Sequence, residues 1–132
     1  MVGIGSGHAG FINYMSTAAA TIRLDLSHAI PTPGKSECGL AWTGNAFWHF
    51  DSGSQLLYLI SLEGKVIRTL PLQDGGCDTE FDGTSLWQAA PTSLKIYQLN
   101  PLTGEILHTL NTIDKCSGLC TDGYNWYRGS WD

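Results

Sequence analysis

Apolar and polar residues alternate in short runs along most of this chain, and tight-turn residues separate the runs. A period of two is typical of β-strands with one buried face. In the first clear example the turns are Thr43-Gly44 and Glu63-Gly64, and glycine can adopt the positive φ that a two-residue hairpin turn requires. This stretch therefore predicts four antiparallel strands, at about residues 39–43, 46–51, 56–61 and 65–70.

The same arrangement returns about 40 residues later. Gly44 and Gly83 are 39 residues apart, and Gly83 and Gly123 are 40 residues apart. Each of these glycines is followed, four residues later, by an aromatic residue: Trp48, Trp87 and Tyr127. The second unit predicts strands at about 78–82, 85–90, 94–99 and 105–110. Repeats of this length are the signature of repeat architectures.

Four antiparallel strands in about 40 residues form the blade of a β-propeller, so we predict an all-β fold made of such blades. The repeat is carried by Gly-Leu-Ala-Trp-x-Gly-x-x-Phe-Trp at residues 39–48, followed by Gly-Lys-Val-Ile-x-Thr-Leu-Pro at residues 64–71. These motifs resemble the repeats of bacterial propellers, in particular glutamine cyclotransferase-like and streptogramin-lyase-like proteins. The resemblance covers residues 38–132 and implies the repeat type, whereas no catalytic motif of either family is matched in this chain.

The two ends of the chain carry only part of a repeat. Residues 116–132 contain the first two strands of a blade, and residues 10–31 can supply the last two, at about 10–15 and 21–31. With the complete blades at 38–76 and 77–115, the chain holds three blades' worth of strands, and propellers need about four to eight blades to close. We therefore predict a homodimer in which N- and C-terminal strands are exchanged to make a six-bladed ring.

Two other interpretations of the ends stay open. The chain can be half of a propeller taken from a longer protein. Alternatively, the run that begins at Ser16 can start a helix, although the alternation in Thr21-Ile-Arg-Leu favours a strand.

Composition limits the partners. The net charge of -5 argues against a nucleic acid or an anionic membrane as the main partner, because both need a basic face. No apolar run approaches the roughly 20 residues of a membrane-spanning helix. Residues 1–10 lack the basic and apolar regions of a secretory signal, so we expect a cytoplasmic protein whose four cysteines are thiols.

Candidate site residues are expected at one mouth of the central channel, where the connections between blades gather. Asp78 and Glu80 are alternate residues of one inner strand, and a carboxylate pair can bind a cation or act as acid and base. His49 and Asp51 follow the aromatic position of the first unit and are further candidates. The commoner role of such residues is structural, because wet channels tolerate carboxylates and strand ends are polar.

Other candidates lie near the C-terminus and at the starts of the inner strands. Arg128 shares a repeat column with His49, and Trp131 falls outside the recurring aromatic set, so both are predicted ligand contacts. Cys38, Cys77 and Cys116 recur every 39 residues and suggest a soft-metal or thiol-redox site. The absence of a Cys-x-x-Cys spacing argues against a dedicated zinc site.

Three functions are therefore weighed. The first is a binding scaffold with an unknown ligand at the channel mouth, because propellers host many unrelated roles. The second is a lyase- or transferase-like enzyme that uses Asp78, Glu80, His49 and Asp51. The third is a thiol or metal site. No cofactor is predicted for any of the three.

Overall fold

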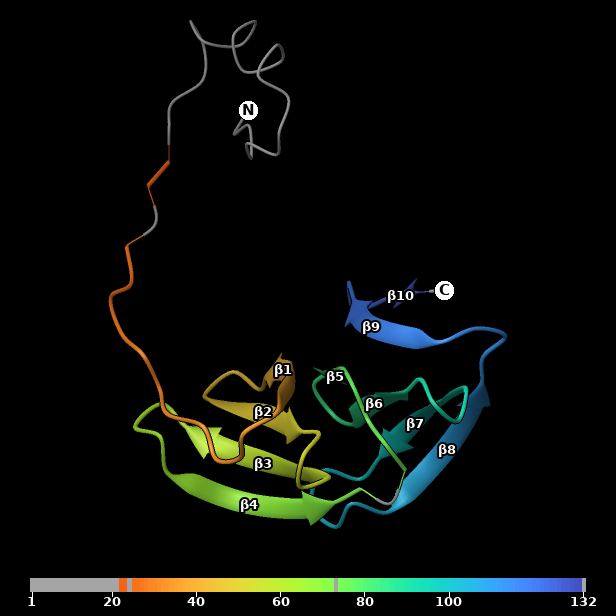
Figure 1. Cartoon of the computed structure of the whole chain (residues 1–132), viewed down its shortest axis with the longest axis horizontal. Coiled ribbons are helices and arrows are strands. Elements are labelled where there is room, and N and C mark those ends of the chain that lie inside the picture. The colour runs from red at the N-terminus through yellow and green to blue at the C-terminus, as the bar shows by residue number, and fades with distance from the viewer. Residues whose placement is uncertain (1–21, 24, 73, 132) are drawn as a thin grey trace, which may run out of the picture.

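The computed structural model describes residues 22–23, 25–72 and 74–131. Within these residues the chain forms ten strands and no helix (Figure 1). Sheet 1 contains β1 (Glu37–Trp42), β2 (Ala46–Asp51), β3 (Leu56–Ser61) and β4 (Val66–Pro71). Sheet 2 contains β5 (Thr79–Phe81), β6 (Leu86–Ala90), β7 (Lys95–Leu99) and β8 (Ile106–Asn111), and sheet 3 contains β9 (Cys116–Thr121) and β10 (Trp126–Ser130).

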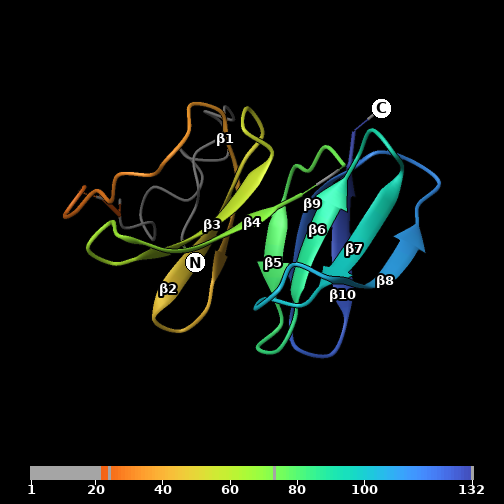
Figure 2. The same cartoon turned by 90° about the horizontal axis from the view of Figure 1, so that it is seen from below.

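Each sheet is an antiparallel meander in which consecutive strands are neighbours. Among the first strands, β5 contacts both β1 and β9, while β4 and β8 lie at the outside of the fan (Figure 1). Figure 2 shows sheets 1 and 2 side by side, with β9 and β10 of sheet 3 behind sheet 2. The prediction of an all-β fold built from propeller-like blades is confirmed, and the strands of sheets 1 and 2 agree with their predicted bounds within two residues.

The turns explain why the repeat is so regular. Gly44, Gly83 and Gly123 have φ values of 101°, 97° and 90° in the turns between the first two strands of each sheet. These values lie in the left-handed region, which favours glycine. Gln55 and Leu94 also have positive φ, 58° and 57°, at matching positions between the second and third strands. Neither position holds a glycine, so the sequence pattern predicted the two turns but not the left-handed backbone at Gln55 and Leu94.

The main core lies between sheets 1 and 2. Trp48 and Phe50 of β2 are buried there together with Leu57 of β3 and with Leu86 and Leu99 of sheet 2. A smaller cluster of Ala89, Ile96, Cys116 and Leu119 joins sheet 2 to sheet 3. Because burying one large apolar side chain stabilises a protein by about 1.5–3 kcal/mol, these contacts hold the sheets face to face.

The N-terminal segment behaves differently from the expected strand. Residues 22–23 and 25–31 form no strand in the single chain, and the strand expected at about 10–15 lies outside the described residues. Ile22 is 56% exposed and Leu26 is 86% exposed, so the described part of the chain leaves these two apolar side chains largely uncovered. Its pairing with a second copy stays a prediction.

Among the described residues, no helical segment has the length and apolar character to cross a membrane.

Candidate functional site

A cavity of about 510 Å³ opens beside the innermost strand of sheet 1. It is lined by the linker before β1, by β1 and β2, and by the residue that precedes β5. The lining residues are Thr32, Glu37, Cys38, Gly39, Leu40, His49 and Asp78. We call this space the β1 cavity, and it combines an imidazole, a thiol and two carboxyl groups.

His49 is the buried polar group of the β1 cavity. It stacks on Tyr58 of β3 with ring centroids 6.4 Å apart, and only 2% of it is exposed. Among the described residues, its Nε2 atom has no hydrogen-bond partner. A buried polar atom without a partner costs free energy, so such an atom in a cavity is a candidate ligand contact.

The repeat shows why His49 lacks a partner. Its counterpart in sheet 2, Gln88, is fully buried and accepts a 2.6 Å hydrogen bond from the Thr79 hydroxyl on the neighbouring strand. In sheet 1 the residue paired with His49 is Leu40, which has no polar atom in its side chain. The first blade therefore replaces a satisfied amide–hydroxyl pair with an imidazole that faces an apolar neighbour.

Asp51 is fully engaged by backbone groups. Its carboxylate accepts hydrogen bonds from the N–H groups of Lys35 at 3.0 Å, Ser36 at 2.7 Å and Ser54 at 2.7 Å. Hydrogen bonds from Ser54 and Ser36 lower the pKa of this buried carboxyl to about 2. Asp51 therefore fastens the linker to sheet 1, and no hydrogen bond joins it to His49 within the described part of the chain.

The role of Asp51 predicts a pH effect. Its folded-state pKa lies below the unfolded value of about 3.9, so the carboxylate stabilises the fold above about pH 4 and this contribution disappears as pH falls towards 2. In Asp51→Asn, denaturant unfolding at pH 7 should show a lower midpoint, and the loss of stability between pH 4 and 2 should be smaller. Asp25→Asn, at an exposed site, is the control. An unchanged pH profile in Asp51→Asn would contradict this role.

Asp78 connects sheet 2 to sheet 3. One carboxylate oxygen accepts a 2.7 Å hydrogen bond from the Leu119 N–H on β9, and the other accepts one from the Thr79 N–H. Glu80 accepts a hydrogen bond from the Phe81 N–H and does not line the β1 cavity. Burial raises the pKa of Glu80, and the negative charge of Asp78 adds to this shift. The two carboxylates are therefore partly buried, with Asp78 held by backbone donors.

The structure brings together two of the three recurring cysteines. The sulfur atoms of Cys38 and Cys77 are 3.0 Å apart at the contact between β1 and β5. Cys116 is instead buried among Ala89, Ile96 and Leu119, so the expected three-thiol group does not form. The repeat has an extra residue before β9, which places Cys116 one position early and turns its side chain into the core. Within the described residues no three His, Cys, Asp or Glu side chains converge as metal ligands.

Arg128 and Trp131 lie on and just after β10, away from the β1 cavity. Arg128 forms an ion pair with Asp114. Trp131 is 59% exposed and lines none of the cavities described here. The predicted ligand-contact group is thus divided: His49 and Asp78 share one cavity, whereas Glu80, Arg128 and Trp131 lie outside it.

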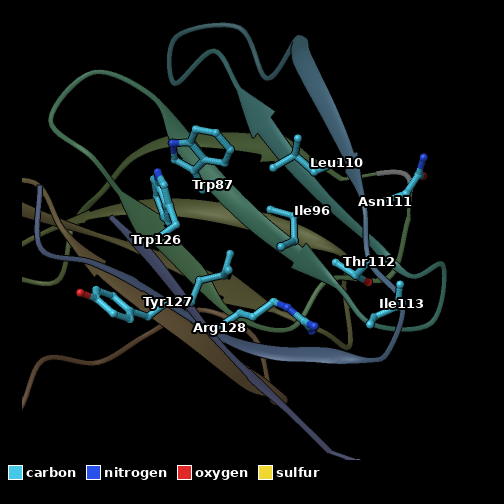
Figure 3. A pocket seen from close by; sticks show the side chains of 10 residues that line it. Trp87, Ile96, Leu110, Asn111, Thr112, Ile113, Trp126, Tyr127 and Arg128 are labelled. Atoms are coloured by element: carbon cyan, nitrogen blue, oxygen red, sulfur yellow. The ribbon is translucent and has the colours of Figure 1, made fainter. Parts of the chain in front are cut away.

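A second, apolar hollow of about 330 Å³ lies between sheets 2 and 3 (Figure 3). We call it the sheet-2 groove. Trp87 and Trp126 meet at its rim with ring centroids 4.5 Å apart, and Ile96 and Leu110 form part of its wall. Arg128 also reaches the groove. The sequence analysis did not predict this surface. The apolar repeat positions at Leu110, Trp126 and Tyr127 could have indicated it, because the third repeat lacks the strands that would cover them.

Neither protein-family models nor curated protein sequences match this chain. Among solved structures it is similar to glutaminyl cyclase from Myxococcus xanthus, with 17% identity and a TM-score of 0.61 over 70% of this chain and 43% of that chain. It is also similar to a luciferin-regenerating enzyme, with 20% identity and a TM-score of 0.58 over 72% of this chain and 37% of that chain. The computationally designed Ika4 protein matches with 14% identity and a TM-score of 0.61, over 80% and 68% of the two chains.

At these identities the similarities show the fold alone. They support a propeller-like arrangement of all-β sheets, in agreement with the resemblance of the repeat motifs. The chain spans less than half the length of the cyclase and of the luciferin-regenerating enzyme.

Proposed function

We propose that this chain is a β-propeller binding scaffold whose ring is completed by a second copy, and that the β1 cavity holds a small organic cation. The observation that carries the binding proposal is the buried, unpartnered Nε2 of His49 in a cavity bordered by carboxyl groups. The proposal that a second copy completes the ring rests on a difference in burial: side chains at equivalent repeat positions are buried in one sheet and exposed in another.

Equivalent side chains become exposed where the next sheet is missing. Trp48 is 1% exposed because sheet 2 covers it, whereas its counterpart Tyr127 on sheet 3 is 51% exposed. In the outer strands, Leu70 is 5% exposed and its counterpart Leu110 is 49% exposed. Sheet 3 lacks the two outer strands that would cover Leu110. Equivalent apolar positions are thus core in an earlier repeat and surface in a later one, which is the pattern expected of an unfinished ring.

The N-terminal strands of a second copy suit the sheet-2 groove. In the repeat order, residues 10–31 are predicted to supply the two strands that sheet 3 lacks. The described linker before β1, residues 25–36, runs on the side of sheet 1 away from sheet 3 (Figure 1). The exposed Ile22 and Leu26 can supply the apolar face that the groove requires. If two copies exchange their N-terminal segments, the segment of each copy fills the sheet-2 groove of the other, and both contacts are related by twofold symmetry.

The chemistry of the β1 cavity favours a cation. Glu37 and Asp78 bring negative charge to its wall, and the net charge of the chain is -5. An imidazole nitrogen can accept a hydrogen bond from an ammonium group, and the negative field stabilises the positive charge. A carboxylate ligand would instead meet like charge.

Three probes with one alkyl chain test this binding: butylammonium, butanol and butyrate. The backbone amide signals of Gly39 and Leu40, which line the cavity, should shift in ¹H–¹⁵N NMR spectra with butylammonium, with a Kd on the order of 1 mM for so small a ligand. Butanol should bind at least about tenfold more weakly, and butyrate should give no shift.

Two histidine variants form the matched pair for this experiment. His49→Gln, which copies the residue of the second blade, should weaken butylammonium binding at least about tenfold. His108→Gln on the exposed strand β8 should leave it unchanged. Equal affinity in both variants, or tighter binding of butyrate, would overturn the proposal for the β1 cavity.

The enzyme hypothesis has less support. Asp51 and Asp78 hold backbone N–H groups, and no side chain of the described residues is aligned with His49 as a nucleophile. Acid–base catalysis by these residues stays a prediction.

A further inference from the structure

We infer that Cys38 and Cys77 form a reversible disulfide that links the innermost strands of sheets 1 and 2. Their sulfur atoms are 3.0 Å apart, about 1 Å more than the length of a disulfide bond. The two cysteines are 39 residues apart and occupy the same position in successive repeats. This inference does not depend on the ring or on the cation site.

The backbones around the two cysteines meet closely. A Cβ atom built on Gly39 would lie 2.7 Å from the carbonyl oxygen of Cys77 and 2.8 Å from the Thr79 nitrogen. Strand β1 is therefore pressed against the approach to β5 at this point, with glycine as the residue that permits the contact. The bond can form by a small rotation of side chains, without separation of the sheets.

The exposure of the four thiols also favours a bond between Cys38 and Cys77 over the other pairs. Both thiols are partly exposed, and Cys38 borders the β1 cavity, so a small disulfide compound can reach them. Cys116 is buried in the apolar cluster. Cys120 is exposed on β9. A mixed disulfide on Cys120 is therefore expected to remain as an adduct.

The chemistry requires an oxidant, and a low-molecular-weight disulfide such as oxidised glutathione supplies it. Burial and the neighbouring Cys77 raise the pKa of the Cys38 thiol to about 12, so we assign the first attack to Cys77. The Cys77 thiolate attacks one glutathione sulfur and releases a glutathione thiolate. Cys38 then gives up its proton, attacks the Cys77 sulfur and releases the second glutathione. In total the two protein thiols lose two electrons and two protons, and one oxidised glutathione becomes two reduced molecules.

The test uses the full chain with all four cysteines. After incubation with oxidised glutathione at pH 8, peptide mass spectrometry should find the peptides of Cys38 and Cys77 linked and about 2 Da lighter than their reduced sum, with any glutathione adduct confined to Cys120. The bond closes a long loop between two sheets, so the Tm should rise by about 10 °C and return after reduction. Exchange should be slow, because the Cys38 thiol is rarely ionised.

Single variants separate this pair from the other thiols. Cys38→Ser and Cys77→Ser should lose both the mass change and the Tm increase, while Cys116→Ser and Cys120→Ser should keep them. A folded wild-type chain that reaches full oxidation only as glutathione adducts would overturn the inference. A link that maps to Cys116 or Cys120, or a reduced and an oxidised form with the same Tm, would do so as well.

Discussion

Gly39→Ala is expected to lower the free energy of unfolding by about 3 kcal/mol. Gly39 has φ of +76°, and an alanine in this left-handed conformation costs about 1–2 kcal/mol. The added Cβ would also lie 2.7 Å from the Cys77 carbonyl oxygen, which belongs to rigid backbone. Strand β1 changes register at this residue, since Cys38 pairs with Phe50 and Leu40 pairs with His49. The bulge brings β1 against the next sheet, so the substitution forces the two sheets apart.

Gly83→Ala is the matched control, measured by urea unfolding followed by tryptophan fluorescence. Gly83 has φ of +97°, but an added Cβ would meet nothing within 4 Å. Only the backbone strain remains, and the expected loss is about 1 kcal/mol. The difference between the two variants measures the contact between sheets 1 and 2. Equal losses would show that β1 and β5 are not in the close contact described here.

The double variant Ile22→Asp with Leu26→Asp is expected to convert the protein from a dimer to a monomer. Both side chains are exposed in the single chain, so two aspartates there cost little within one protomer. In the completed ring they would face the sheet-2 groove, where Trp87 and Leu110 offer no partner for a charge. The apparent mass in sedimentation should fall by half.

Ile67→Asp controls for the loss of an exposed apolar residue, because Ile67 is 55% exposed on the outer strand β4. This variant should keep the mass of the unsubstituted chain. Removal of residues 1–31 should give the same monomer as the double variant. A dimer that persists without residues 1–31 would show that strand exchange does not complete the ring.

The repeat made most of the fold predictable. The spacing of Gly44, Gly83 and Gly123 located the hairpin turns, and the aromatic residues after them located the second strand of each sheet. The strands of sheets 1 and 2 were expected within two residues of their observed bounds, because alternation and turn glycines define both face and ends. The internal order of each sheet followed from the short connections, which join antiparallel neighbours.

The site was less predictable because it depends on departures from the repeat. The pairing of His49 with Leu40 instead of with a threonine leaves an imidazole without a partner, and this is visible only once the register is known. The capture of Asp51 by the N–H groups of Lys35 and Ser36 depends on the path of an irregular linker. One extra residue before β9 was enough to move Cys116 out of the expected thiol group and into the core.

The β1 cavity and the ring are connected by position. Within the described residues, no sheet packs on the face of sheet 1 that carries Leu40 and Trp42, and these side chains are 59% and 47% exposed. Sheet 2 covers one face of sheet 1. In the proposed ring, sheet 3 of a second copy would cover the opposite face, which carries Leu40 and Trp42. In the proposed ring the cavity therefore has walls from two copies.

Sedimentation equilibrium of the unmodified chain tests the central claim most directly. A second copy that completes the ring predicts a mass of about 29 kDa, twice the 14.3 kDa of one chain, over a wide range of concentration. A mass of 14.3 kDa for a stably folded chain at all concentrations would contradict the account.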